Sequence, residues 1–288
     1  MNTNIKSDKV NFIGIGGQRC GKTTMYSWLR EHPQVSTSSE MELHFFNNCY
    51  DRGYEWYEGN FEQNEKILLT GEMSSSYLYD QSVPERVYKY YPEMKIILSV
   101  RNPIDRLISA FRHDIQIGNV VSDGEDSISK GIENNPTYLE YGMYAKYFNE
   151  WLNIFPRENI FVIIFEQMIE TPQQTYLELC DFLNIDNSFT PHTINKKMNQ
   201  SWLPKSRRLI FYQKNIAKIF RSVGLGKLVD GLKTLGLKTV IDRLNTVEKS
   251  MIIDIDNVLK SYLIDFFKND VQEHSKHLNI DLKKIWFE

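Results

Sequence analysis

Residues 13–26 combine a short apolar stretch, a glycine-rich turn and a helix-forming segment, in that order. Such a layout points backbone N–H groups and the positive end of a helix dipole at one place, which makes a site for an anion such as phosphate. Residues 16–23 also fit the phosphate-loop pattern G-x-x-x-x-G-K-[ST]. On this pattern alone, a nucleotide kinase or an NTPase is the first hypothesis.

A basic residue at the end of a later apolar stretch argues against that first hypothesis. The strand expected over 95–100 runs directly into Arg101, and the strand expected over 159–165 runs into Glu166. A magnesium-dependent P-loop NTPase needs an apolar strand that ends in Asp to hold the metal, and neither of these strands does. An arginine at the carboxyl end of a central strand suits a second phosphate instead. The two places together predict a ligand with two separate anionic groups, bound without a metal ion.

The elements that position these residues alternate between strand and helix. Strands are expected over 11–16, 66–69, 95–100 and 159–165, and helices over 22–31, 84–91, 103–113, 139–155 and 171–183. Near-continuous apolar strands separated by helices indicate a parallel sheet that is covered on both faces. We expect an α/β, P-loop NTPase-like fold in a single domain, residues 1–288. Its α/β core would span 11–200, and residues 201–288 would add a helical C-terminal region.

The composition is that of a globular protein, with 41% hydrophobic and 25% charged residues and a net charge of −3. This charge gives no general attraction to nucleic acid. The three cysteines are widely spaced, which favours a reducing compartment over a disulfide framework. No signal peptide and no apolar run long enough for a membrane span are recognisable. We therefore expect a soluble, cytoplasmic protein that binds no nucleic acid.

The charge is unevenly distributed along the chain. Residues 205–243 hold ten Lys or Arg against two Asp, a net charge of +8. A solvated pair of amphipathic helices would explain this segment. It could also contact an anionic membrane or a polyanionic glycan. Two of its residues, Lys205 and Arg207, could help to cover a bound phosphate.

Four stretches, in this order, resemble those of PAPS-dependent sulfotransferases, the group that includes bacterial and heparan sulfate-type enzymes. They are residues 17–26, 32–46, 95–109 and 141–166, and the segment 281–286 is similar to the usual end of that family. The resemblance implies PAPS as donor and PAP, the 3′,5′-bisphosphate nucleotide, as product, with no metal. It also implies transfer of the sulfuryl group to a hydroxyl, and we expect the acceptor to be a saccharide or a glycolipid.

The resemblance assigns roles to individual residues. The expected ligands of the 5′-phosphosulfate are Arg19, Cys20, Gly21, Lys22, Thr23 and Thr24. Those of the 3′-phosphate are Arg101 and Ser109, with Lys205 and Arg207 as additional contacts. The expected catalytic residues are Glu42 as general base, Arg19 beside the leaving phosphate oxygen, and His44 as the rival base.

Three positions depart from the family pattern or leave alternatives open. The family more often has Thr or Ser at Lys22, whose side chain either contacts the phosphosulfate or points outward. Met73 stands where some glycan enzymes carry a lysine, and Lys22 could supply the missing charge. Arg106 is interpreted as a helix-surface or scaffold cation, while His113 either faces the acceptor or is exposed.

Two alternatives to a sulfotransferase are kept. One is a kinase or NTPase that uses the phosphate-loop pattern literally. The other is a non-catalytic, sulfotransferase-like protein that binds a glycan or lipid through residues 205–243.

Overall fold

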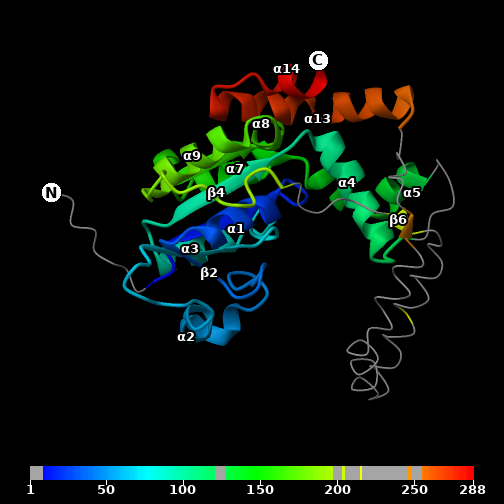
Figure 1. Ribbon diagram of the computed structural model, residues 1–288. Coiled ribbons are helices and arrows are strands. Elements are labelled where there is room, and N and C mark those ends of the chain that lie inside the picture. Colours follow the sequence, from blue (N-terminus) through cyan, green and yellow to red (C-terminus); the bar gives the residue numbers. More distant parts are fainter. Residues whose placement is uncertain (1–8, 121–126, 197–202, 205–214, 216–245, 248–254) are drawn as a thin grey trace. The chain divides into compact units, whose positions relative to one another are not determined.

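The computed structural model describes residues 9–120, 127–196, 203–204, 215, 246–247 and 255–288 (Figure 1). The chain divides into two compact units. The first comprises residues 1–106, 141–198 and 264–288, and the second comprises residues 107–140 and 199–263. The expectation of one domain over 1–288 stays a prediction. None of the helices within the described ranges is both long and apolar enough to cross a bilayer.

The first unit is built on a parallel sheet of five strands, which confirms the expected α/β fold. The strand order is β2-β3-β1-β4-β5, so β1 lies in the middle. The strands are β1 (Phe12–Gly16), β2 (Val35–Thr37), β3 (Leu69–Met73), β4 (Lys95–Val100) and β5 (Ile160–Ile164). Gly16, at the end of β1, pairs with Leu98 of β4. The segments that follow β1 and β4 therefore leave the sheet side by side, at its carboxyl edge.

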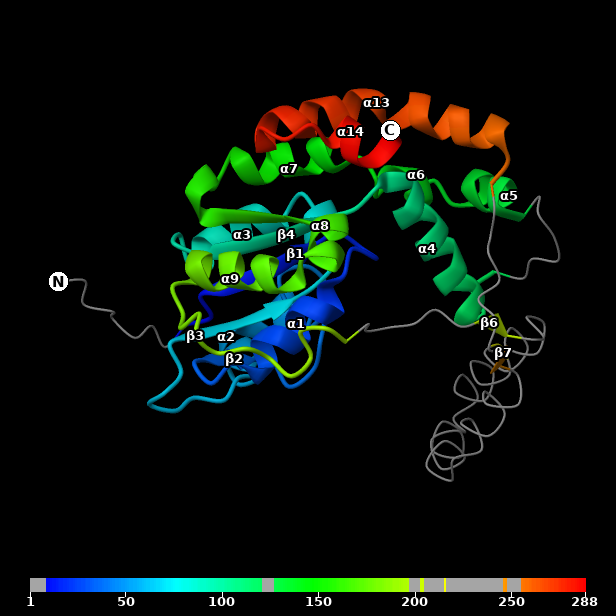
Figure 2. The same cartoon turned by 45° about the horizontal axis from the view of Figure 1, so that its top comes forward.

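Helices cover both faces of this sheet (Figure 2). One face carries α1 (Lys22–Glu31), α8 (Phe165–Glu170) and α9 (Pro172–Leu183), whose apolar residues share one buried cluster with Phe12 and Ile97 of the sheet. The opposite face carries α3 (Val83–Tyr90) and α7 (Tyr144–Leu152). The carboxylate of Asp270, on α13 (Asn257–Leu278), accepts hydrogen bonds from the backbone N–H groups of Ala145 and Lys146 at the start of α7. This carboxylate thus caps α7 from another helix.

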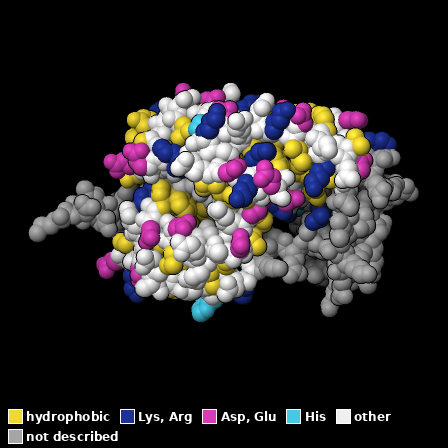
Figure 3. All heavy atoms as spheres, turned by 90° about the horizontal axis from the view of Figure 1, so that it is seen from above, with side chains coloured by type: hydrophobic (Ala, Val, Ile, Leu, Met, Phe, Trp, Pro, Cys, Tyr) yellow, Lys and Arg dark blue, Asp and Glu magenta, His cyan; other side chains and the backbone are white. Residues whose placement is uncertain are grey.

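The remaining described elements are short, apart from α4. They are α2 (Gly53–Glu58), α4 (Pro103–Gln116), α5 (Ser127–Asn134), α6 (Thr137–Glu140), α14 (Leu282–Phe287), the 3₁₀ helices η1 (Tyr50–Arg52), η2 (Tyr77–Tyr79) and η3 (Arg157–Asn159), and the antiparallel pair β6 (Leu203–Pro204) and β7 (Thr246–Val247). Helices α13 and α14 confirm the expected helical C-terminal region, and the short pair β6–β7 is an addition that the sequence did not predict. On the face of the protein in Figure 3, basic and acidic side chains are mixed over the described surface, in keeping with the small net charge.

Two elements have different bounds in the structure from those expected. The strand expected over 66–69 is β3 at Leu69–Met73. It includes Gly71, where a Cβ would lie 2.2 Å from the carbonyl oxygen of Phe12, and the buried carboxyl of Glu72. Neither residue belongs to the apolar pattern of a buried strand. The helix expected over 139–155 is α7 at Tyr144–Leu152, because the chain turns at Gly142, against the ring of Phe267.

Candidate functional site

The loop between β1 and α1, residues 17–21, is held from two sides. The N–H of Gly17 donates to the carbonyl of Ser99 on β4 at 2.5 Å, and the Ser99 hydroxyl donates to the carbonyl of Cys20 at 2.6 Å. On the other side, the N–H of Gln18 donates to the Tyr79 hydroxyl at 3.1 Å. The loop is thus a fixed structure, with its position set by β4 and Tyr79.

Helix α1 begins at this loop without a side-chain cap. Its N-cap residue is Gly21, with a φ of 87°, which has no side chain to accept a hydrogen bond from the first turn. A Cβ at Gly21 would lie 2.4 Å from Met168 Cε and 2.9 Å from Phe165 Cδ2, so only glycine fits between the loop and α8. An uncapped helix N-terminus is a favourable place for an anion.

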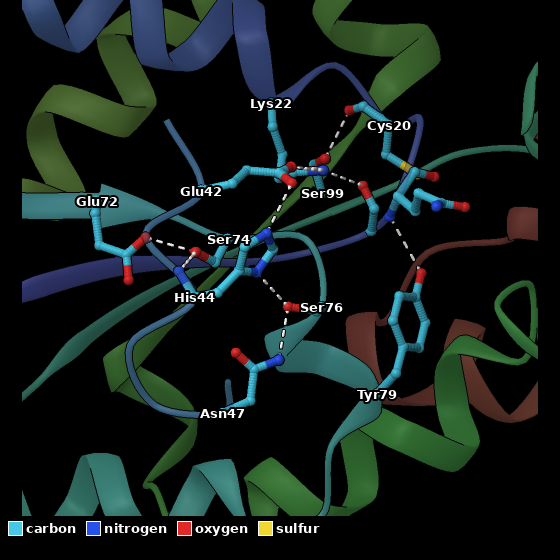
Figure 4. A network of polar contacts seen from close by, with 12 residues as sticks. Cys20, Lys22, Glu42, His44, Asn47, Glu72, Ser74, Ser76, Tyr79 and Ser99 are labelled. Carbon is cyan, nitrogen blue, oxygen red and sulfur yellow. Dashed lines mark hydrogen bonds and ion pairs between the residues drawn. The ribbon is translucent and has the colours of Figure 1, made fainter. Parts of the chain in front are cut away.

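Lys22, the first residue of α1, is buried and does not point outward (Figure 4). Its ammonium donates to the carbonyl of Gly17 at 3.0 Å and lies 3.8 Å from Glu42 Oε1. Burial lowers the pKa of Lys22, while the negative charge of Glu42 acts in the opposite direction. Of the two interpretations left open by the sequence, the outward-pointing one is wrong. The ammonium lies between the loop and the carboxylate expected to act as base.

Glu42 and His44 lie on a segment after β2 and share an unusual backbone conformation. Their φ angles are 60° and 53°, in the left-handed region that side chains other than glycine rarely adopt. The backbone N–H of Glu42 donates to the Met73 carbonyl at 3.1 Å, and that of His44 donates to the Ser74 hydroxyl at 3.1 Å. Strained residues of this kind cluster at functional sites, and these contacts hold both residues in place.

Both ring nitrogens of His44 face polar groups. His44 Nδ1 lies 2.8 Å from the Ser76 hydroxyl, which also accepts a hydrogen bond from the Asn47 amide at 2.8 Å. His44 Nε2 lies 3.5 Å from Glu42 Oε2. In the tautomer in which the Ser76 hydroxyl donates to His44 Nδ1, the ring proton lies on Nε2, toward Glu42. In this arrangement the imidazole supports the carboxylate of Glu42.

Behind this segment lies Glu72, a fully buried carboxyl group on β3. It accepts hydrogen bonds from the Ser74 hydroxyl at 2.7 Å and from the hydroxyl of Tyr77. Burial raises the pKa of Glu72 to about 7, although the hydrogen bonds from Tyr77 and Ser74 lower it. Since Ser74 also binds the backbone of His44, Glu72 belongs to the support of the site.

Arg101 follows β4 and lies beside the loop. Its guanidinium lies 4.5 Å from the centre of the Phe165 ring, and one of its terminal nitrogens donates to the Arg19 carbonyl at 3.5 Å. Its Nε atom is buried and has no hydrogen-bond partner among the described residues. Phe165 therefore lies against both Arg101 and Gly21, the two places where anions are expected. Sequence reasoning missed Phe165, although its position directly after β5 was a usable signal.

The other predicted site residues are placed as follows. Thr23 and Thr24 are half-buried on the first turn of α1. The Cys20 thiol is buried, 3.6 Å from the Tyr144 hydroxyl, and burial raises its pKa. The side chain of Cys20 thus faces the interior, which leaves its backbone as the part available to a ligand.

Three further assignments have different outcomes. Arg106 is fully buried, so its interpretation as a surface cation is wrong and the scaffold interpretation remains. Ser109 and His113 are half-buried on α4, in the second unit, and their assigned roles stay predictions. Lys205, Arg207 and nearly all of the basic segment lie outside the described residues.

The features of the loop and of Arg101 fit a ligand with two anionic groups. The uncapped start of α1 and Arg19 lie at one place, and the unpartnered Nε of Arg101 lies at the other. The cradle at Gly21 leaves no room for a Cβ. This donor set consists of backbone N–H groups and cations, which suits phosphate and sulfate groups.

Comparisons with known proteins agree with this geometry. A family model described as the sulfotransferase domain matches residues 11–227. Heparan sulfate glucosamine 3-O-sulfotransferase 6 of Mus musculus is 28% identical over 180 residues, covering 61% of this chain and 52% of its own. A membrane-associated sulfotransferase of Dictyostelium discoideum is 24% identical over 306 residues, covering 73% of this chain and 64% of its own. The chain thus spans about half the length of the heparan sulfate relative.

Solved structures share the fold at low sequence identity. A sulfotransferase from Alicyclobacillus acidocaldarius aligns with a TM-score of 0.71 and 23% identity, over 97% of this chain and 99% of its own. A mouse sulfotransferase solved in complex with PAP aligns with a TM-score of 0.56 and 16% identity, over 94% of this chain and 86% of its own. The five-stranded parallel sheet and its helices are therefore the fold of these proteins.

Proposed function

Because the chain belongs to the sulfotransferase domain family, we propose that it transfers the sulfuryl group of PAPS to an acceptor hydroxyl and releases PAP. The observation that carries this proposal is the ion pair of Lys22 with Glu42. It joins a loop suited to an anion to a carboxylate suited to accept a proton. The mouse relative solved with PAP supports this choice of donor.

The donor would be held at two places. The 5′-phosphosulfate is assigned to Arg19, Lys22 and the first-turn N–H groups of α1, including those of Thr23 and Thr24. The 3′-phosphate is assigned to Arg101, whose Nε has no other partner among the described residues, together with Ser109. When bound, PAPS supplies an activated sulfuryl group. Arg19 and Lys22 then stabilise the negative charge that collects on the departing phosphate oxygen.

Glu42 is the proposed general base. Its carboxylate accepts the proton of the acceptor hydroxyl as the bond between that oxygen and sulfur forms. His44 Nε2 faces one oxygen of Glu42 and Lys22 faces the other, so both help to fix the position of the carboxylate. His44 is the less suitable base, because Ser76 and Glu42 engage its two ring nitrogens.

The acceptor class is proposed from the relatives. Several of them carry names of heparan sulfate glucosamine 3-O-sulfotransferases, which supports a saccharide or glycoconjugate hydroxyl as the acceptor. The basic segment 205–243 could contact such a glycan or an anionic membrane, and a cytoplasmic location is part of the same hypothesis. These assignments stay predictions.

The two alternatives are less well supported. A magnesium-dependent kinase or NTPase needs a carboxylate free to hold the metal. In β3, next to β1, the Glu72 carboxyl is instead engaged by Ser74 and Tyr77. A non-catalytic binding protein would not need the Lys22–Glu42 pair or its support from His44.

Calorimetric titration with PAP, and separately with ATP plus Mg²⁺, tests the proposed donor. We expect PAP to bind, R101A to bind it much more weakly, and EDTA to have no effect. Transfer of ³⁵S from labelled PAPS to heparan sulfate, a glycolipid and simple sugars then tests the reaction, with E42Q as the inactive control. A preference for Mg-ATP over PAP would show that the phosphate-loop pattern is literal and the proposal wrong.

A further inference from the structure

Asn102, the residue after Arg101, is fixed by two segments that are distant in the sequence. Its backbone N–H donates to Glu166 Oε1 at 2.9 Å, and its side-chain amide donates to the Trp286 carbonyl at 2.6 Å. Its side-chain oxygen accepts a hydrogen bond from the N–H of Ile104 at 2.9 Å, at the start of α4. Both the backbone and the side chain of Asn102 are therefore held.

Glu166 connects these contacts to one another. While its Oε1 atom binds the backbone of Asn102, its Oε2 atom accepts a hydrogen bond from the Trp286 indole at 2.9 Å. The indole is almost completely buried. Asn102, Glu166 and Trp286 thus form a closed set of three hydrogen bonds, which we call the α14 clamp, because Trp286 lies on α14.

The clamp acts on the backbone directly next to Arg101. Phe165, the neighbour of Glu166, packs against the guanidinium of Arg101 at 4.5 Å. Two consecutive residues at the start of α8 therefore contact two consecutive residues after β4. A long side chain such as that of Arg101 loses conformational freedom on binding, and a fixed backbone and a fixed ring reduce that loss.

We propose that Glu166 and Trp286 are positioning residues that orient Arg101 toward the 3′-phosphate of the nucleotide. This inference rests on the proposed function, because it assigns the 3′-phosphate to Arg101. It adds that α14 supports the nucleotide site. Glu166 and Trp286 act on the nucleotide through Arg101 and do not contact it.

Two nucleotides that differ only in the 3′-phosphate isolate this effect. Binding of adenosine 3′,5′-bisphosphate and of 5′-AMP is measured by calorimetry for the wild type, W286F and E166Q. E166Q replaces one acceptor oxygen of the clamp at nearly constant volume, whereas W286F removes the indole donor together with part of the ring. The matched control is W151F, because the buried Trp151 indole has no hydrogen-bond partner among the described residues. Thermal unfolding is followed for every variant.

We expect W286F and E166Q to weaken binding of the bisphosphate about 3- to 10-fold, the size of one lost hydrogen bond, and to leave 5′-AMP binding unchanged. W151F should keep the wild-type ratio of the two affinities. A wild-type ratio in both clamp variants would overturn the inference, as would an equal loss for both nucleotides. If the wild type itself does not prefer the bisphosphate, the assignment of Arg101 fails, and the inference fails with it. The two failures are distinct, because only the second is seen in the wild type.

Discussion

Lys22 Nζ lies 3.8 Å from Glu42 Oε1, so the first residue of α1 forms an ion pair with a residue 20 positions later. The lysine is buried and the carboxylate is about one-third exposed. One partner belongs to the anion-binding loop and the other to the strained segment after β2. The pair therefore connects the proposed donor and acceptor sides of the site.

Removal of this positive charge should impair catalysis more than folding. We expect K22M to lower kcat about 10- to 100-fold, the cost of a lost interaction between charged groups. The exposed lysine of α3 offers a control, and K89M should retain full activity. In a double-mutant cycle, K22M should cost little more once Glu42 has been replaced by Gln. Additive losses would show that the two residues act independently.

Substitutions at the two rival bases should have unequal effects. E42Q removes the proposed proton acceptor, and we expect kcat to fall about 10²- to 10⁴-fold. H44N removes only a neighbour of that carboxylate, so its loss should be about 10-fold or less, and S76A should resemble it. The measurement is sulfuryl transfer from labelled PAPS at saturating acceptor. A larger loss in H44N than in E42Q would assign the base to His44.

The buried carboxyl of Glu72 should make stability depend on pH. Its pKa is raised from 4.5 to about 7 in the folded protein, so the folded state holds this proton more tightly than the unfolded state. The contribution of Glu72 is therefore most favourable below about pH 4.5 and is lost as the pH rises through 7. The free energy of unfolding of the wild type should fall by roughly 3 kcal/mol through Glu72 between pH 5 and 8. In E72Q this fall should be absent. Urea denaturation of both proteins at these two pH values is the measurement. An equal change in the free energy of unfolding in both proteins would contradict the assignment.

His274 on α13 should act in the opposite direction. Its side chain is fully buried, both ring nitrogens lack partners among the described residues, and burial lowers its pKa to about 3. The unfolded state takes up this proton first, so stability is lost as the pH falls below 6.5. We expect H274F to reduce the loss between pH 7 and pH 5 by roughly 2 kcal/mol. Urea denaturation at the two pH values, compared with the wild type, is the test.

Alanine substitution at two glycines with positive φ can distinguish a loss of stability from a loss of ligand binding. Gly21 and Gly53 have φ angles of 87° and 79°, and Ala at either position should cost about 1 to 3 kcal/mol of stability. At Gly21 the new Cβ would meet α8, whereas at Gly53 no atom of the described residues lies within 4 Å of it. We expect G21A to weaken PAP binding at least about 10-fold, the effect of displacing the loop from a close contact, and G53A to leave it unchanged. Equal PAP affinities in the two variants would show that the loop tolerates a Cβ.

Local sequence pattern predicted the elements that carry the anion site. The expected strand over 95–100 and helix over 22–31 coincide with β4 and α1, because apolar runs and a glycine turn are local signals. The predicted position of β3 was wrong because its interior contains Gly71 and Glu72, which do not fit the apolar pattern of a buried strand. Gly71 fits there because it packs against Phe12, and Glu72 fits because it accepts a hydrogen bond from Tyr77. Both contacts join separate segments of the chain.

The contacts between side chains of the site could not be predicted from the sequence. The sequence showed Lys22 and Glu42 as candidates, but not that one would bury its ammonium beside the other. The role of Phe165 depends on the meeting of α8, Gly21 and Arg101 in space. Likewise, the buried state of Arg106 depends on tertiary packing, and its position on a helix gave no signal of it.

The contact between Asn102 and Trp286 spans 184 residues, which has a consequence for the order of synthesis. The segment around Arg101 leaves the ribosome long before α14 does. Until α14 has been made and has docked, the Asn102 side chain lacks its hydrogen bond to the Trp286 carbonyl, and Glu166 lacks the one from the Trp286 indole. A nascent chain can therefore complete its sheet before the α14 clamp has formed, and the full affinity for the 3′-phosphate is reached only after α14 has docked.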